Sequence, residues 1–202
     1  MSINVCNDRS MASITSLPSG VSGGSLVLLE TQTASSSSTI SFTSNIDSTY
    51  KEYQFHFIDI HPATDAAHFQ VQGSTNRGSS YGITATSSFF AAVHQEDGAS
   101  SSLAYYTSLD IAQGTGFIDI GAGDTGNGND ESLSGKMHLF DPSNTTFVKH
   151  FMARSSCYNP NDTEVDALVG GYFNTTSAID AIQFKMSSGN IDSGTFKLYG
   201  VV

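Results

Sequence analysis

The feature that most constrains this chain is the alternation of apolar and polar residues within short segments. Residues 53–60 read YQFHFIDI, and this alternation places Tyr53, Phe55, Phe57 and Asp59 on one face and Gln54, His56, Ile58 and Ile60 on the other. Successive side chains of a β-strand point to opposite faces of the sheet. Aromatic residues at every second position therefore predict a strand that packs one face on a core.

Similar segments recur along the chain, at intervals of roughly 10 to 15 residues. We expect strands at residues 26–33, 39–43, 53–60, 68–72, 89–94, 103–109, 114–120, 134–140, 145–154, 165–173, 181–186 and 194–202. Turn-forming residues separate them at 35–38, 45–49, 95–102, 157–162 and 187–193, and a glycine-rich loop occupies 121–130. Residues 62–66 favour a hairpin between 53–60 and 68–72, and short helical turns are expected only at 63–67 and 176–182. The pattern predicts an all-β protein, an antiparallel β-sandwich of jelly-roll type.

The chain divides into an N-terminal segment, residues 1–24, and a single sandwich domain, residues 25–202. The first segment follows neither the helical nor the strand period, and it contains Ile14 and Leu17 among small and polar residues. Two interpretations stay open for it. It is either a disordered tail or an extended arm that becomes ordered on a neighbouring subunit.

Charge narrows the range of partners. Only 13% of the residues are charged, and the formal net charge is −11. An acidic surface repels nucleic acid and anionic membranes, so we expect neither as a partner. No apolar stretch is long enough to span a bilayer, and the N-terminus lacks the pattern of a signal peptide, so we expect no membrane insertion. Cys6 and Cys157 are far apart in the sequence, and unpaired thiols are favoured over a disulfide between them.

Metal-binding patterns are weak. The six histidines are His56, His61, His68, His94, His138 and His150, and none is spaced as HxH or HxxxH. His138 and His150 lie on the two arms of a predicted hairpin and could face each other. The densest set of oxygen ligands lies between Asp119 and Glu131, a loop that could wrap a calcium ion. A solvated acidic loop is the favoured interpretation, and we predict no metal site and no cofactor.

Catalytic patterns are weaker still. The chain has no GxSxG elbow, no phosphate-binding loop and no dinucleotide-binding fingerprint. Asp59, Glu96 and Asp166 could converge as paired carboxylates, but nothing in the sequence selects them. There is no Trp for sugar stacking, although Tyr81, Tyr105, Tyr106 and Tyr158 could replace it. We therefore predict no catalytic residues and no enzymatic activity.

Three segments carry a resemblance to a known class of protein. Residues 181–201 read AIQFKMSSGNIDSGTFKLYGV, residues 26–53 read LVLLETQTASSSSTISFTSNIDSTYKEY, and residues 130–150 read DESLSGKMHLFDPSNTTFVKH. These segments resemble short virion structural or tail-fibre-like proteins of marine tailed bacteriophages, of the cyanophage type. The resemblance contains no catalytic motif, carries over no functional residue, and does not extend to residues 73–128.

The resemblance implies a non-enzymatic virion structural protein on the particle exterior, made in the bacterial host cytoplasm. Capsid decoration protein, tail fibre, baseplate and tail-tip component all stay open, because a small β-sandwich suits each of them. The expected partners are other copies of the chain, with a trimer favoured, and other virion proteins. The alternative is a lectin-like module that binds a host surface glycan.

Overall fold

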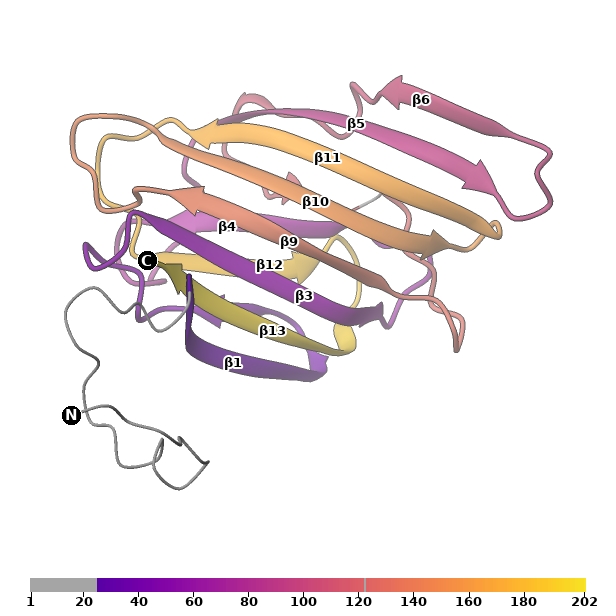
Figure 1. Cartoon of the computed structure of the whole chain (residues 1–202), viewed down its shortest axis with the longest axis horizontal. Coiled ribbons are helices and arrows are strands. Elements are labelled where there is room, and N and C mark those ends of the chain that lie inside the picture. Colours follow the sequence, from indigo (N-terminus) through magenta and orange to yellow (C-terminus); the bar gives the residue numbers. More distant parts are fainter. Residues whose placement is uncertain (1–24, 122) are drawn as a thin grey trace, which may run out of the picture.

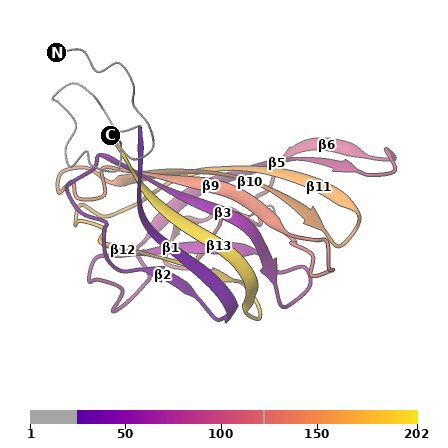
Figure 2. The ribbon, with the colours of Figure 1, turned by 60° about the horizontal axis from the view of Figure 1, so that its bottom comes forward.

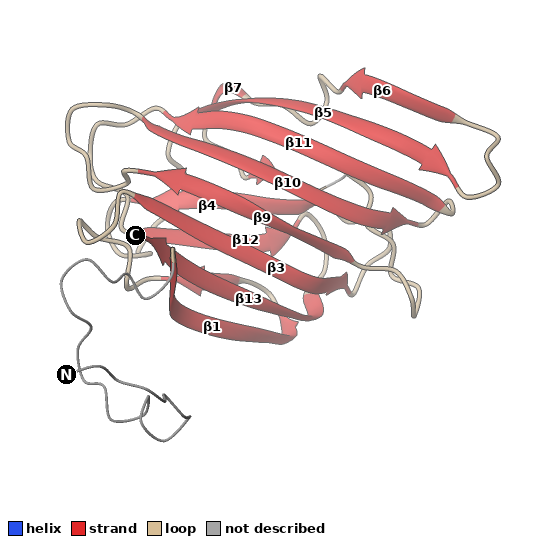
Figure 3. Ribbon diagram, viewed as in Figure 1, coloured by secondary structure: helices blue, strands red, loops and turns tan. Residues whose placement is uncertain are grey.

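The computed structural model describes residues 25–121 and 123–202, and these residues form an all-β protein (Figure 3). The predicted arm at residues 1–24 and its anchors Ile14 and Leu17 lie outside the described residues. The prediction of antiparallel sheets packed as a sandwich is confirmed. The short helical turns expected at 63–67 and 176–182 do not form: residues 63–66 are a bend and a turn, residues 176–177 are a bend, and residues 181–182 already belong to a strand. No helix capable of crossing a lipid bilayer occurs in residues 25–121 or 123–202.

The larger sheet has nine strands and forms the front layer in Figure 1. Eight of them follow the order β1-β13-β3-β9-β10-β11-β5-β6, and β7 also pairs with β5. Their bounds are β1 Leu26–Ser37, β13 Ile191–Val201, β3 Glu52–Pro62, β9 Leu133–Phe140, β10 Lys149–Asn159, β11 Thr163–Phe173, β5 Ala85–Gln95, β6 Ser101–Tyr105 and β7 Ala112–Gly114. All pairings are antiparallel.

The smaller sheet has four strands and lies behind the first (Figure 1). Its order is β2-β12-β4-β8, with bounds β2 Ile40–Phe42, β12 Ala181–Met186, β4 Phe69–Ser74 and β8 Ile118–Asp119. Strands next to each other in sequence often lie in opposite sheets: β1 and β2, β3 and β4, and β12 and β13 each divide in this way. Chain connections therefore link the two layers repeatedly.

Phenylalanine side chains fill the space between the sheets. Phe184 on β12 lies at the centre, with its ring centroid 5.0 Å from that of Phe57, 5.4 Å from that of Phe55 and 5.7 Å from that of Phe69. Phe42 and Phe196 complete the cluster, and all these side chains are at most 2% exposed. Each buried aromatic ring contributes on the order of 2–3 kcal/mol through the hydrophobic effect. The alternation seen in residues 53–60 thus produces the main contact between the layers.

A β-bulge corrects one detail of the predicted β3. Its register shifts between Phe57 and Ile60, and Asp59 has a positive φ of 52°. Asp59 is consequently exposed and Ile60 is fully buried, the reverse of the faces expected from strict alternation. The extra residue of a bulge moves every later side chain to the other face.

Three further expectations about strands are wrong. The hairpin predicted between residues 53–60 and 68–72 does not exist, because β3 lies in the large sheet and β4 in the small one. The turn predicted at 35–38 is largely strand, since β1 runs to Ser37, where it pairs with Ile191. The single strand predicted at 114–120 is two short strands, β7 and β8, in different sheets.

One end of the large sheet extends beyond the small sheet. Figure 2 shows β5 and β6 continuing away from the small sheet, in the direction opposite to β1. The connection after β6 returns along the edge of β5, where the Tyr106 amide donates to the Phe89 carbonyl at 2.9 Å and the Ser87 amide donates to the Ile111 carbonyl at 2.8 Å. Its Tyr106 and Leu109 side chains lie over the inner face. This connection, in place of the small sheet, covers the inner face of β5.

Candidate functional site

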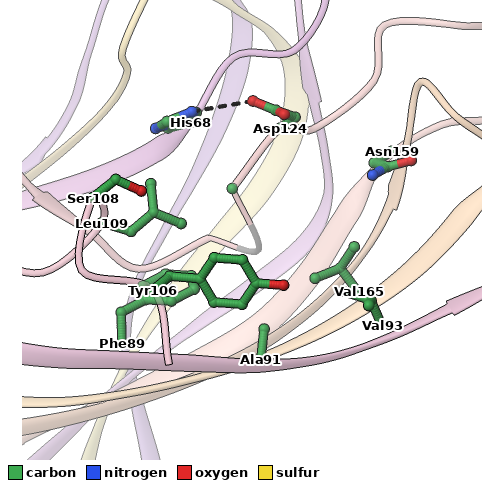
Figure 4. Close-up of a pocket in the computed structure, with 11 residues that line it drawn as sticks. His68, Phe89, Ala91, Val93, Tyr106, Ser108, Leu109, Asp124, Asn159 and Val165 are labelled. Carbon is green, nitrogen blue, oxygen red and sulfur yellow. Dashed lines mark hydrogen bonds and ion pairs between the residues drawn. The ribbon is translucent and has the colours of Figure 1, made fainter. Parts of the chain in front are cut away.

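A cavity of about 350 Å³ lies beneath this extension (Figure 4). Phe89, Ala91 and Val93 occupy alternate positions on β5, so their side chains share its inner face. Val165 on β11 is the register partner of Val93 and continues the same surface. The two paired strands therefore give the cavity a firm apolar floor.

An aromatic residue forms one wall. Tyr106 follows β6, and its ring meets the Phe89 ring edge to face, with the centroids 6.1 Å apart and an interplanar angle of 85°. The Leu109 amide donates to the Tyr106 carbonyl at 3.2 Å, and this turn brings Leu109 beside the ring (Figure 4). Packing and backbone hydrogen bonds together fix the orientation of the Tyr106 ring.

The opposite rim is polar. His68 Nε2 lies 3.2 Å from Asp124 Oδ1, the contact drawn in Figure 4, and His68 Nδ1 lies 3.4 Å from Asp119 Oδ1. The hydrogen bond with Asp119 raises the pKa of His68, and the charges of both aspartates raise it further, against the opposing effect of burial. The protonated imidazole can donate to both carboxylates, which holds the rim together.

The lining suits an uncharged ligand that has both apolar surface and hydroxyl groups. The Tyr106 ring and the floor offer apolar contact, and Asp124 and Asn159 offer hydrogen-bonding groups. Negative ligands would meet the charge of Asp124. Ser108 also lines the cavity, but no described histidine forms a hydrogen bond with its hydroxyl. The cavity thus has the features of a binding site and lacks an activated serine.

The remaining histidines lie apart from this cavity. His138 is not opposite His150: its partner on β10 is Met152, and its Nδ1 lies 2.6 Å from a Glu52 carboxylate oxygen. His150 packs against the Tyr172 ring, and His61 lies 3.0 Å from the Gly128 carbonyl oxygen. Within residues 25–121 and 123–202, no three His, Cys, Asp or Glu side chains converge as metal ligands.

The acidic loop between Asp119 and Glu131 does not act as one unit. Asp119 and Asp124 approach His68, whereas the Asn127 amide donates to an Asp65 carboxylate oxygen at 3.2 Å. Glu131 instead accepts a hydrogen bond from the Gly128 amide. The carboxylate oxygens of this loop thus take part in separate local contacts and do not converge on one point.

The three carboxylates considered for catalysis are also separated. Asp59 lies on β3 and Asp166 on β11, with β9 and β10 between them, so about 14 Å of sheet separates their strands. Asp166 forms an ion pair with Arg154, with Oδ2 2.6 Å from Nη2. Glu96 follows the end of β5. Paired-carboxylate hydrolysis requires about 5–10 Å, so Asp59 and Asp166 do not form such a pair.

The four tyrosines proposed as sugar platforms do not share one groove. Tyr106 lines the cavity, whereas its neighbour Tyr105 is 53% exposed and its hydroxyl donates to Asp110. The Tyr158 hydroxyl donates to Asp162 at 3.1 Å. The Tyr81 hydroxyl is buried and has no hydrogen-bond partner in the described part of the chain. Only Tyr106 is therefore placed to bind a ligand in the cavity.

Cys157 lies on β10 and is 3% exposed. Burial raises the pKa of its thiol to about 12, so the thiolate is scarce at neutral pH. No disulfide joins Cys157 to another described residue. Cys6 lies outside the described residues.

Sequence reasoning missed Asn159 and Val165 as cavity residues. Asn159 lies in a segment expected to be only a turn, and Val165 reads as an ordinary core position. No local pattern identifies them, because the cavity exists only where β11 and the connection after β6 come together. Comparison of the chain with protein-family models, with curated proteins and with solved structures finds no match.

Proposed function

We propose that the protein is a non-enzymatic structural component on the exterior of a bacteriophage virion, and that it assembles as a symmetric oligomer. The observation that carries the proposal is an apolar surface on the outer face at the end of the large sheet. It is formed by Phe90, Leu103 and Tyr105 on β5 and β6, which are 40%, 73% and 53% exposed, and by Met152 on the same face of β10, which is 59% exposed and is separated from β5 by β11. We call these four residues the edge patch.

The geometry of the edge patch favours assembly between copies. Tyr105 is the register partner of Phe90, and Leu103 that of Ala92, so the apolar side chains continue across β5 and β6. β6 is also a terminal strand of the sheet, and its free backbone groups can pair with another strand. Exposed apolar patches beside an open edge are typical of protein–protein interfaces.

The strand order supports the same proposal. We interpret β1-β13-β3-β9 packed on β2-β12-β4-β8 as the eight strands of a jelly roll. β5, β6 and β7 are then an insertion between β4 and β8, and β10 and β11 are an insertion between β9 and β12. Both insertions extend the large sheet and create the edge patch. Jelly rolls occur in viral capsid and lectin domains, so the fold fits the proposal without deciding it.

The arm belongs to this proposal. In it, residues 1–24 bind a neighbouring subunit or the particle, because an extended segment needs a partner surface to offset an ordering cost of about 1–2 kcal/mol per residue. The test is a deletion of residues 1–24, followed by measurement of thermal stability and of incorporation into particles. We expect unchanged stability and lost incorporation. Incorporation at wild-type occupancy would refute the role of the arm.

A lectin-like module is the second candidate, and the cavity at Tyr106 favours it. A glycan array tests it with two variants, Tyr106→Ala in the cavity and Tyr105→Ala on the outer face as the matched control. A glycan signal that only Tyr106→Ala removes would support this function. No signal for the wild-type protein, or equal loss in both variants, would reject it.

A further inference from the structure

A row of basic side chains crosses the outer face of the large sheet. Lys197 on β13 lies directly opposite His56 on β3, His56 lies opposite Lys136 on β9, and Lys136 lies opposite Arg154 on β10. Register partners in a sheet share a face, and the neighbours of these residues along each strand are buried, apart from the half-buried Gly135. We call these four residues the basic row.

The basic row concentrates positive charge on an acidic protein. Lys136, Arg154 and Lys197 are three of the eight Lys and Arg residues in a chain of net charge −11. Like charges directly opposite each other on paired strands destabilise a sheet. The pKa of His56 is lowered, first by burial and then by the charges of Lys136, His138 and Lys197. A binding function would explain why this unfavourable arrangement is present.

Most of this charge lacks a partner within the described part of the chain. Arg154 binds Asp166 through two hydrogen bonds, of 2.9 and 2.6 Å. No described carboxylate oxygen lies within 4.0 Å of the ammonium groups of Lys136 or Lys197. Lys136 is exposed and Lys197 half-buried, so both ammonium groups can reach a ligand above the sheet.

The surroundings indicate the class of ligand. A shallow depression of about 510 Å³ includes His56, Lys136, Arg154 and the Ser134 hydroxyl, and its lining also contains Ser156, Glu164 and Asp166. Asp166 is paired with Arg154, and Glu164 accepts a hydrogen bond from the Ser156 hydroxyl at 3.0 Å, so the unpaired cation of the depression is Lys136. The Tyr199 ring lies beside His56, with its centroid 4.7 Å from that of the imidazole. Cations, hydroxyls and a half-buried aromatic ring are the groups that bind the charged substituents, hydroxyls and apolar faces of sugars.

The length of the row agrees with a linear chain of sugars. Adjacent strands are about 4.8 Å apart, so the four strands from β13 to β10 span about 14 Å. Duplex DNA is disfavoured, because it carries about one negative charge per 1.7 Å and the remainder of this protein is strongly acidic. A polysaccharide with sulfate or carboxylate groups has sparser charge. The acidic rim of the Tyr106 cavity disfavours binding of such an anionic chain in the cavity itself.

We propose that the basic row is a binding site for an anionic polysaccharide lying across β13, β3, β9 and β10. The site is independent of the proposed virion role, because it requires only the outer face of one folded domain. Sulfate or carboxylate groups contact Lys136 and Lys197, and sugar hydroxyls contact Ser134, because the Ser156 hydroxyl already donates to Glu164.

The test measures binding of the full-length protein to immobilised alginate, which carries one carboxylate per sugar, with a lightly sulfated dextran as the sulfated probe and neutral dextran as the blank. The test variant is Lys136→Gln with Lys197→Gln. The matched control is Lys51→Gln with Lys185→Gln, which removes the same charge from positions outside the row. Circular dichroism checks that both variants are folded.

We expect binding that weakens as salt rises, a loss of about tenfold or more in the test variant, and a change of less than about twofold in the control. The proposal is overturned by equal losses in both variants, or by no binding of either anionic polymer at low salt. Equal or tighter binding of duplex DNA overturns the polysaccharide assignment. The proposal is also overturned if the protein binds neither polymer but self-associates in a salt-sensitive way that only the test variant loses. That result would assign the basic row to contact with a second copy of the chain.

Discussion

Lys136 and Arg154 lie directly opposite each other on β9 and β10, and of the two only Arg154 has a carboxylate partner among the described residues. The Arg154–Asp166 pair therefore neutralises one end of the basic row and leaves Lys136 and Lys197 as unpaired cations on the two sides of His56. The two unpaired lysines beside His56 should therefore affect its pKa, which can be measured.

We predict that His56 titrates below the ordinary histidine range and that its pKa rises in the Lys136→Gln, Lys197→Gln variant. The groups facing its ring are the two lysines, His138, Gln54 and Tyr199. Removing two positive charges favours the imidazolium form. NMR titration of the ring protons measures the change, and Lys51→Gln is the control. An unchanged pKa in the double variant would contradict the electrostatic account.

The lowered pKa of His56 also determines in which direction the stability of the protein changes with pH. His56 binds a proton more weakly in the folded state than in the unfolded state, so the unfolded state takes up more protons as the pH falls. The contribution of His56 to stability is therefore present above about pH 6.5 and decreases as the pH falls toward its folded-state pKa. Urea unfolding at several pH values should show a smaller decrease in the double-lysine variant.

The Phe184 cluster should dominate the stability of the sandwich. Phe184→Ala removes a ring that contacts phenylalanines of both sheets, and we expect a loss of about 3–5 kcal/mol in the free energy of unfolding. Phe147→Ala is the matched control, because Phe147 is 68% exposed and its loss should change stability by less than about 0.5 kcal/mol. Equal losses would show that the cluster is not the centre of the core.

The sequence predicts those parts of the fold that depend on a local pattern. The alternation in β3 correctly predicts the buried face of Tyr53, Phe55 and Phe57, because it involves only neighbouring residues. The assignment of β4 to the other sheet is not local: residues between Pro62 and Phe69 carry turn signals that fit a hairpin equally well. The bulge at Asp59 is not visible in the alternation either, since it depends on the packing of neighbouring strands.

The candidate sites were harder to predict than the fold. The sequence offers Tyr106 only as one of four tyrosines, and the cavity distinguishes it from the other three. No local pattern predicts the basic row, because Lys136, Arg154 and Lys197 lie far apart in the chain. The alternation can place each of them on an outer face, but only the strand order and register bring them together.

The edge patch should control self-association. Leu103→Asp places a charge at a side chain that is 73% exposed, so we expect the domain to stay folded and the oligomer to dissociate. Phe147→Asp changes another exposed apolar residue outside the patch and should leave the oligomer intact. Light scattering of both variants gives the masses. If the Leu103→Asp variant keeps the mass of the wild-type oligomer, the contact between copies does not involve the edge patch. If the wild-type protein is itself a monomer, the proposal that it assembles through this patch is wrong.

Cys157 should be unreactive in the native protein. With its thiol pKa raised to about 12 and its side chain 3% exposed, it should resist iodoacetamide at pH 8 and react once guanidinium unfolds the chain. Peptide mapping by mass spectrometry distinguishes Cys157 from Cys6. Rapid labelling of Cys157 in the folded protein would show that β10 is more accessible than its burial indicates.

The central claim is that this sandwich is a structural part of a virion exterior. An electron cryomicroscopy map of particles purified from the host that makes this chain tests it most directly. The account predicts density for the two-sheet domain on the outside of the particle, repeated by symmetry, with the edge patch of one copy against its neighbour. Particles that are complete without the chain would contradict the claim.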